Sequence, residues 1–112
     1  AGAGVRAGVA LNYLIWKDEA GAELYINTPD PDENKRLFDR LIVERDSIEQ
    51  DFGERLIWDR MDEKKASRVR YLIQQGGLDD GEESWPAIQE AMVSSMDRLA
   101  RAVLPRLGRI DI

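Results

Sequence analysis

The sequence contains no cysteine and no histidine. Disulfides and thiolate metal sites are therefore excluded, as are Ser-His-Asp and Cys-His catalysis and the usual zinc sites. No stretch approaches the roughly 18 consecutive apolar residues of a membrane-spanning helix. The N-terminus also lacks the basic and apolar regions of a signal peptide. We therefore expect a cytoplasmic protein with no membrane contact, no metal site and no cofactor.

The 112 residues are 43% hydrophobic, which is enough for one core, so we expect residues 1–112 to form a single domain. The net charge of −6 argues against general adhesion to nucleic acids or membranes, and any such binding would have to be local. Ala1-Gly-Ala-Gly4 leads straight into a predicted strand, without a cap or loop. We therefore expect the chain to be the C-terminal part of a longer protein or domain.

The first half of the chain predicts two strands and a helix. Residues 5–16 alternate as a strand does, and residues 22–27 form the return strand after a turn. One face of the first strand carries Ala7, Val9, Leu11, Tyr13 and Ile15. Asp30 and Pro31 are typical of a helix start. The helix that follows has an apolar stripe of Phe38, Leu41, Ile42, Ile48 and Phe52, and it ends at Gly53.

The second half predicts a β-hairpin over residues 55–73 and a last helix. In the hairpin, Val69, Tyr71 and Ile73 alternate with Arg68, Arg70 and Leu72. A polar, glycine-rich loop over residues 74–81 precedes the helix. The apolar stripe of that helix is Trp85, Ile88, Met92, Met96, Leu99, Val103 and Leu107. Pro105 should kink or end it near its last turn.

These elements predict an α+β fold in the order ββαββα. A four-stranded antiparallel sheet with two helices on one face is the economical way to bury both helical stripes.

Several short segments, in this order, resemble a known family. They are Glu23-Leu-Tyr-Ile26, Lys35-Arg-Leu-Phe38, Ile48-Glu-Gln-Asp-Phe-Gly53, Leu56-Ile-Trp-Asp-Arg60, Lys65-Ala-Ser-Arg-Val69 and Trp85-Pro86. The chain resembles the prokaryotic domain-of-unknown-function family numbered four-two-six-eight over residues 5–107. The resemblance implies a domain that often lies at the C-terminal end of longer proteins, some of them with a restriction-nuclease-like domain ahead. It implies no catalytic residues.

Lys64, Lys65, Arg68 and Arg70 place four cations within seven residues of the hairpin. Residues 55–70 hold six Lys or Arg and three Asp or Glu, a net +3 in an acidic chain. These four residues are candidates for phosphate contacts with a nucleic acid. The alternative is a solvated outer face, because an antiparallel sheet covered on one side leaves its other side polar. Lysine at a hairpin also protects a sheet edge from pairing.

Trp85, Met92 and Met96 are candidates for an adaptable partner surface, since methionine repacks easily, although core positions are the alternative. The acidic run at Asp30–Asn34 lacks the Gly and Glu of a calcium loop and is explained by a helix N-terminus. Its carboxylates and Lys35 are packed too closely for the nuclease arrangement, in which separate strands bring two carboxylates to one magnesium ion. No catalytic residue is assigned.

The first functional hypothesis is therefore a non-catalytic accessory or interaction domain of a prokaryotic protein, with a nuclease- or defence-associated protein as one option. Its partner would be another protein or a second copy of the chain. The alternative is a nucleic-acid-binding module that uses the basic face at residues 64–70. A third hypothesis is part of a metal-dependent nuclease completed by residues ahead of Ala1.

Overall fold

The computed structural model describes residues 2–74 and 76–110. Its strands are β1 (Gly2–Arg6), β2 (Val9–Ile15), β3 (Ala20–Ile26), β4 (Ile57–Asp59) and β5 (Ser67–Leu72). Its helices are α1 (Pro31–Ile42), α2 (Arg45–Phe52) and α3 (Trp85–Leu107). Two short 3₁₀ turns, Leu78–Asp80 and Glu82–Ser84, lead into α3.

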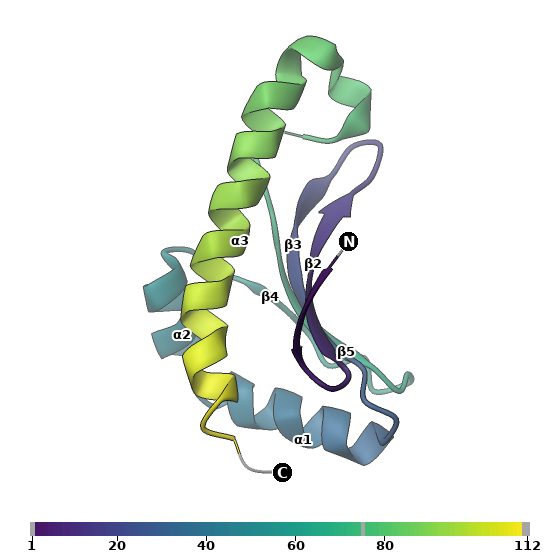
Figure 1. Ribbon diagram of the computed structural model, residues 1–112, viewed down its shortest axis with the longest axis vertical. Helices are drawn as coiled ribbons and strands as arrows, with labels where there is room; N and C mark the ends of the chain where they lie inside the picture. The colour runs from purple at the N-terminus through teal and green to yellow at the C-terminus, as the bar shows by residue number, and fades with distance from the viewer. Residues whose placement is uncertain (1, 75, 111–112) are drawn as a thin grey trace.

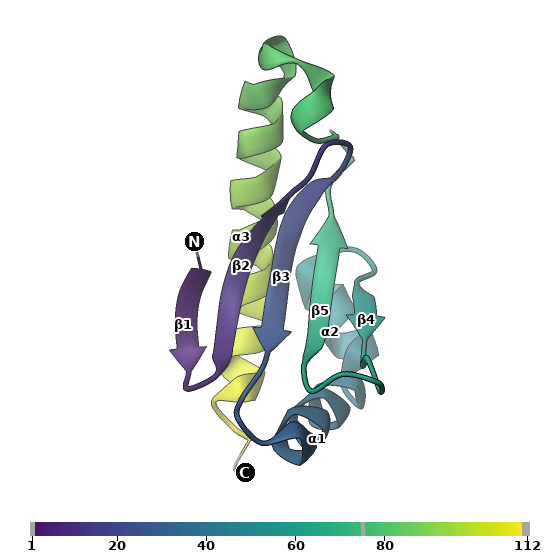
Figure 2. The ribbon, with the colours of Figure 1, turned by 90° about the vertical axis from the view of Figure 1, so that its right-hand side faces the viewer.

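The strands form one antiparallel sheet in the order β1-β2-β3-β5-β4. α3 lies along one face of the sheet, chiefly over β3, with α2 packed beside it and α1 against β5 and β3 (Figure 1). In the view onto the face of the sheet away from α3, no described helix crosses in front of the strands (Figure 2). The predicted α+β class and antiparallel sheet are confirmed. The predicted order ββαββα is wrong, because both the first strand and the first helix are divided in two.

The predicted strand over residues 5–16 is interrupted by a turn at Ala7–Gly8. Gly8 has a φ of +82°, and a Cβ there would lie 2.6 Å from the Thr28 Cα atom. The Gly8 carbonyl also accepts a hydrogen bond from the Asn27 amide at 2.7 Å. Glycine adopts this backbone conformation without strain, so the chain turns at Gly8. The residues before the turn therefore form a separate strand, β1, and the sheet has five strands instead of four.

The predicted helix over residues 31–52 bends after Ile42. It begins as expected, because Asp30 Oδ1 accepts a hydrogen bond from the Asp32 amide at 2.9 Å and Pro31 is the first helical residue. Glu44 leaves helical geometry, with φ −100° and ψ 21°, and Val43 is 83% exposed at the bend. Dividing the helix lets α1 pack on the sheet while α2 packs on α3.

The predicted hairpin over residues 55–73 is confirmed as β4 and β5, which pair antiparallel. Gly53 ends α2 with a φ of +101°, as the sequence predicts. Val69, Tyr71 and Ile73 are buried, whereas Arg68 and Arg70 lie on the opposite face of the strand.

The predicted last helix is confirmed as α3, and Pro105 lies inside it without ending it. The proline removes an amide that would bond the carbonyl of Arg101, which is an exposed residue, so water can replace that bond. Ile88, Leu99, Val103 and Leu107 are buried as expected.

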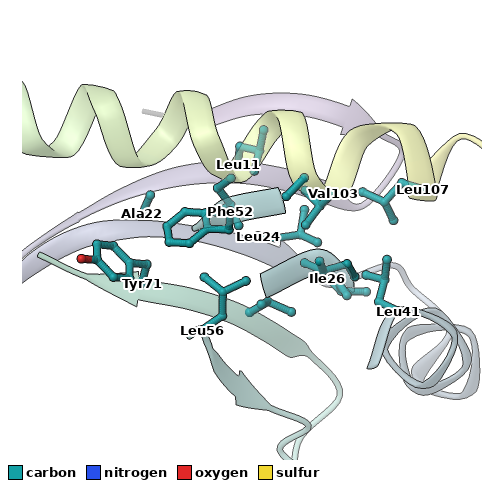
Figure 3. Packing of buried hydrophobic residues seen from close by; sticks show 14 of the residues in the cluster. Leu11, Ala22, Leu24, Ile26, Leu41, Phe52, Leu56, Tyr71, Val103 and Leu107 are labelled. Carbon is teal, nitrogen blue, oxygen red and sulfur yellow. The ribbon is translucent and has the colours of Figure 1, made fainter. Parts of the chain in front are cut away.

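The core lies between α3 and the sheet, where Leu11, Leu24, Phe52 and Val103 meet (Figure 3). Arg6 ties β1 to the end of α3 by donating hydrogen bonds to the carbonyls of Leu107 and Ile110, at 3.4 and 3.3 Å. Within the described part of the chain, no helix is both long and apolar enough to cross a membrane.

Candidate functional site

The four predicted nucleic-acid contacts divide into two pairs. Lys64 and Lys65 are exposed in the loop between β4 and β5. Arg68 and Arg70 lie on the sheet face away from the helices, and both form ion pairs with the same carboxylate oxygen of Asp59, at 3.1 and 3.2 Å. Their charge is thus partly neutralised, which leaves the two loop lysines as the more accessible cations.

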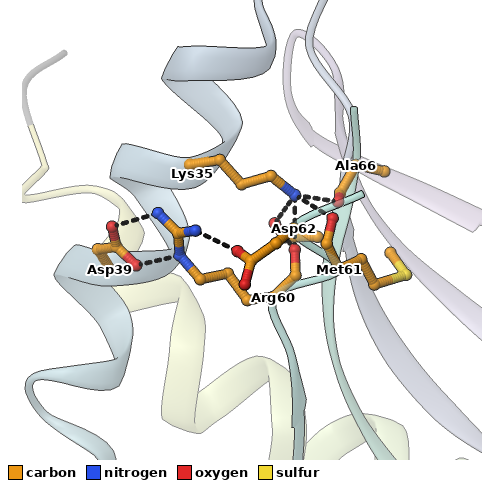
Figure 4. Close-up of polar contacts among 7 residues, drawn as sticks. Lys35, Asp39, Arg60, Met61, Asp62 and Ala66 are labelled. Atoms are coloured by element: carbon orange, nitrogen blue, oxygen red, sulfur yellow. Dashed lines mark hydrogen bonds and ion pairs between the residues drawn. The ribbon is translucent and has the colours of Figure 1, made fainter. Parts of the chain in front are cut away.

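The loop that carries these lysines is fixed to α1 by Lys35 (Figure 4). The Lys35 ammonium lies within hydrogen-bond distance of the carbonyl oxygens of Arg60, Met61 and Ala66, at 2.6, 2.8 and 2.7 Å, and of Ser67 Oγ at 3.0 Å. Burial and the neighbouring charge of Arg60 lower the pKa of Lys35. The ammonium is thus enclosed by the backbone, so its role is to hold the loop.

Two further residues fasten the same loop. Arg60 makes two hydrogen bonds to the carboxylate of Asp39 on α1, at 2.8 and 3.0 Å, and it also pairs with Asp62. The hydrogen bond from Arg60 lowers the pKa of Asp39. The buried Asn34 donates to the Lys65 carbonyl at 3.0 Å. The loop is therefore a rigid support for Lys64 and Lys65.

The outer face of the sheet carries both signs of charge. Glu23 stands opposite Asn12 on β2 and Arg70 on β5, and it is only 6% exposed. Asn12 donates to its Oε1 atom at 3.4 Å, and its Oε2 atom has no hydrogen-bond partner. With Asp59 and Glu23 beside Arg68 and Arg70, this face is a mixed polar surface rather than a positive stripe.

A second polar cluster lies where α2, α3 and β5 meet. The Arg98 guanidinium lies 4.4 Å from the centre of the Phe52 ring and donates to the Phe52 carbonyl at 3.2 Å. Tyr71 donates to Glu54 at 2.8 Å, and burial together with this carboxylate raises the pKa of Tyr71. These contacts join α2 to α3 and β5. The described residues contain no group of three or more acidic side chains placed to hold a metal ion.

The three residues predicted as a partner surface also separate. Met92 is buried in the core and Met96 packs against it, half-buried. Trp85 is 42% exposed at the start of α3. Of this group, Trp85 alone therefore presents a large area to solvent.

Trp85 belongs to an apolar surface between the start of α3 and β2. It lines a cavity of about 180 Å³ with Ile15, Gly77, Ile88 and Gln89. Gln89 also borders a shallow depression that contains Val93, which is 59% exposed. Tyr13 lies on the same strand face as Ile15 and, like it, is more than 40% exposed. We call Tyr13, Ile15, Trp85, Gln89 and Val93 the α3–β2 surface.

Backbone contacts bring the two parts of this surface together. The turn after β2 is closed by a hydrogen bond from the Trp16 amide to the Glu19 carbonyl at 2.7 Å. The Asp79 amide donates to the Lys17 carbonyl at 2.6 Å, and Gly77 lies so close to the turn that a Cβ would clash with the Trp16 carbonyl. The segment before α3 is thereby docked on the turn between β2 and β3, which places Trp85 beside Ile15.

Sequence reasoning missed most of the α3–β2 surface. Alternation groups Tyr13 and Ile15 on one face with Val9 and Leu11, and the structure shows that this face turns toward the helices. Alternation does not show where the covering helix lies. In the structure α3 covers β3 more than β2, so the far end of β2 stays exposed. The signal that was available is the charge pattern, because residues 78–97 hold six Asp or Glu and no Lys or Arg.

Comparison with known proteins gives one match. The chain matches the family model described as "Domain of unknown function (DUF4268)" over residues 1–107. No curated protein and no solved structure matches it. Since the matched range includes nearly the whole chain, this protein belongs to the DUF4268 family.

Proposed function

We propose that this domain is a non-catalytic interaction module, and that the α3–β2 surface is where it binds its partner. The observation that carries the proposal is the gathering of exposed apolar side chains on one side of α3. Tyr13, Ile15, Trp85 and Val93 are each between 41% and 59% exposed. Soluble proteins rarely leave large apolar side chains grouped around a cavity unless the surface binds something.

Trp85 and Ile15 have the character of binding hot spots. Tryptophan is enriched among the residues that dominate binding energies, particularly beside a pocket that a partner side chain can fill. The contacts that hold this surface together join the β2–β3 turn to the segment before α3. Single substitutions on the surface should therefore leave the main core intact.

The test is co-purification from the cells that encode the domain, with three variants. Ile15→Ser and Trp85→Ser change the α3–β2 surface, and Val43→Ser is the matched control because Val43 is exposed at the distant α1–α2 bend. We expect a protein present at fixed stoichiometry with the wild type and Val43→Ser to be lost with the other two variants. Titration calorimetry with the purified components should reproduce this pattern.

Two results would contradict the proposal. One is a stoichiometric partner that all variants retain, since its contact would then lie elsewhere. The other is that no co-purifying protein is lost from the surface variants and that light scattering gives the same molar mass at two protein concentrations. Neither a partner protein nor self-association would then have been found. Urea unfolding of each variant shows whether a loss of binding merely reflects a loss of folding.

The second candidate is nucleic-acid binding through the basic loop. It is favoured by the exposure of Lys64 and Lys65 on a rigid loop within a region of net +3 charge. The ion pairs of Arg68 and Arg70 with Asp59 weigh against it. Contact would therefore be weak, electrostatic and strongly dependent on salt.

A further inference from the structure

We propose that the α3–β2 surface binds a basic amphipathic helix from a separate partner protein. This helix lies alongside α3, over β1 and β2, and seats one large apolar side chain between Ile15 and Trp85. The inference rests on the proposed function, to which it adds the chemistry of the partner. Three features of the molecule support it: the width of the sheet, the cavity and the distribution of charge.

The sheet is wider than the helices that cover it. Its five strands span about 19 Å at a spacing of roughly 4.8 Å. Helices pack about 8–10 Å apart. α3 lies chiefly over β3, and β1 packs chiefly against β2. On the other side, α1 packs against β5, and Phe52 of α2 contacts Tyr71 of β5. One more helix at normal spacing from α3, on the side away from α2, would lie over β1 and β2.

The exposed side of α3 has the spacing that a neighbouring helix requires. Gln89, Val93, Ala100 and Leu104 follow one another at intervals of four, seven and four residues. These intervals place them along one side of the helix. Val93 and Leu104 are exposed, and Ala100 is half-buried. After Gln89, the row is made of apolar or small residues, which is the kind of surface on which a second helix packs.

The cavity supplies an anchor point for that helix. It holds about 180 Å³ and is lined by Ile15, Gly77, Trp85, Ile88 and Gln89, so its walls are almost wholly apolar. A cavity of roughly 150 Å³ accepts a benzene molecule. One leucine or phenylalanine side chain of a partner would therefore fit, and removing it from water would favour binding.

The charge around this surface selects a basic partner. Residues 78–97 hold six Asp or Glu and no Lys or Arg, and residues 17–19 hold two acids and one lysine. Together these two segments carry a charge of −7. Since the whole chain has a net charge of −6, all its other residues together carry +1. All eight of these acids are exposed. The negative charge of the domain is thus concentrated around the α3–β2 surface, where it attracts cations and steers their approach.

The same charge disfavours a second copy of the chain as the occupant. A symmetric dimer would bring the same acidic surface of each copy together, and juxtaposed like charges are unfavourable. A helix with apolar residues on one side and Lys or Arg on the other matches both the cavity and its rim. This is the helix-in-groove mode of peptide recognition.

The test uses three synthetic peptides of about 18 residues, long enough to lie along roughly 27 Å of α3. The first is a Leu/Lys amphipathic helix. The second is its Leu/Glu counterpart, and the third has the Leu/Lys composition in an order without an apolar face. Fluorescence anisotropy of each labelled peptide is measured with the 112-residue domain at about 0.05 M and 0.3 M salt, across which screening increases markedly.

We expect the Leu/Lys helix to bind at least about tenfold more tightly than either other peptide, and to weaken with salt. Ile15→Ser and Trp85→Ser should each weaken it by about tenfold, whereas Val43→Ser should not. The triple change Glu82→Gln, Glu83→Gln and Glu90→Gln should reduce the difference between the Leu/Lys and Leu/Glu helices. The three glutamates are exposed, so this variant should keep its fold.

Equal binding of the reordered Leu/Lys peptide would overturn the inference, because attraction between charges alone would then explain the result. Equal binding of the Leu/Glu helix at the same surface would overturn the basic chemistry and leave the proposed function intact. Binding of no peptide, or self-association that Ile15→Ser abolishes, would overturn the helical partner. Only the co-purification experiment decides whether the proposed function itself fails.

Discussion

Lys35→Met should destabilise the domain strongly although methionine has a similar length. The variant removes an ammonium that reaches four oxygen acceptors. The Arg60 carbonyl would keep its hydrogen bond from Ser67 Oγ, and the Met61 carbonyl would keep the one from the Lys64 amide. The Ala66 carbonyl has no other hydrogen-bond partner among the described residues.

One unpaired buried carbonyl costs about 1–3 kcal/mol, and the hydrogen bonds of a charged donor contribute about 1.5–3 kcal/mol. The removal of a partly desolvated cation offsets some of this loss. We therefore expect Lys35→Met to lower the free energy of unfolding by about 2–4 kcal/mol in urea titrations followed by tryptophan fluorescence. Arg36→Met, on the exposed side of α1, is the control and should change it by less than about 0.5 kcal/mol. Equal losses from the two variants would refute the role given to Lys35.

Three further predictions concern the core, a buried hydroxyl and the basic loop. Leu99→Ala should cost about 2–5 kcal/mol in urea melts, because Leu99 is fully buried; a loss below about 0.5 kcal/mol would show that α3 is peripheral. Since the pKa of Tyr71 is raised, its contribution to stability is present below the unfolded value near 10 and is lost as pH rises through the folded value. Tyrosine ionisation is followed by absorbance at 295 nm, and the pH titration of Tyr71→Phe is subtracted from that of the wild type to isolate Tyr71. This difference should have its midpoint above pH 10, and Glu54→Gln should lower that midpoint. Any binding of labelled duplex DNA should be weak, on the order of 10⁻⁴–10⁻⁶ M; Lys64→Ala with Lys65→Ala should weaken it for every sequence, and unchanged affinity would remove the basic loop as a binding site.

Patterns that repeat along one element predicted the structure well. The α3 stripe from Ile88 to Leu107 and the alternation of β5 are confirmed, because each reflects burial on a single regular face, although Trp85 at the start of the stripe is exposed. The two errors fall where one residue changes the direction of the chain. Gly8 sits in apparent alternation but forms a turn, and the bend at Val43 lies inside a stripe that reads as continuous.

The candidate sites were predicted less completely, because they depend on contacts between distant segments. The partners of Lys35 are backbone carbonyls and a hydroxyl 25 to 32 residues away, and no side-chain pattern marks a carbonyl as an acceptor. The sequence alone makes Trp85 a candidate for a partner surface. The exposure of Ile15 beside it follows from the position of α3 over the sheet, which periodicity does not determine.

The most direct test of the α3–β2 surface uses the indole N–H signals of two tryptophans in a ¹H–¹⁵N correlation spectrum. Trp85 lines the cavity, whereas Trp58 packs on Phe38 and donates to Glu49 at 3.1 Å, away from that surface. Titration with the Leu/Lys helix should shift the Trp85 signal and the Ile15 and Gln89 amides, and leave Trp58 and Lys64 unchanged. Shifts confined to Lys64 and its loop, or a Trp85 signal that does not move while the peptide binds, would contradict the account.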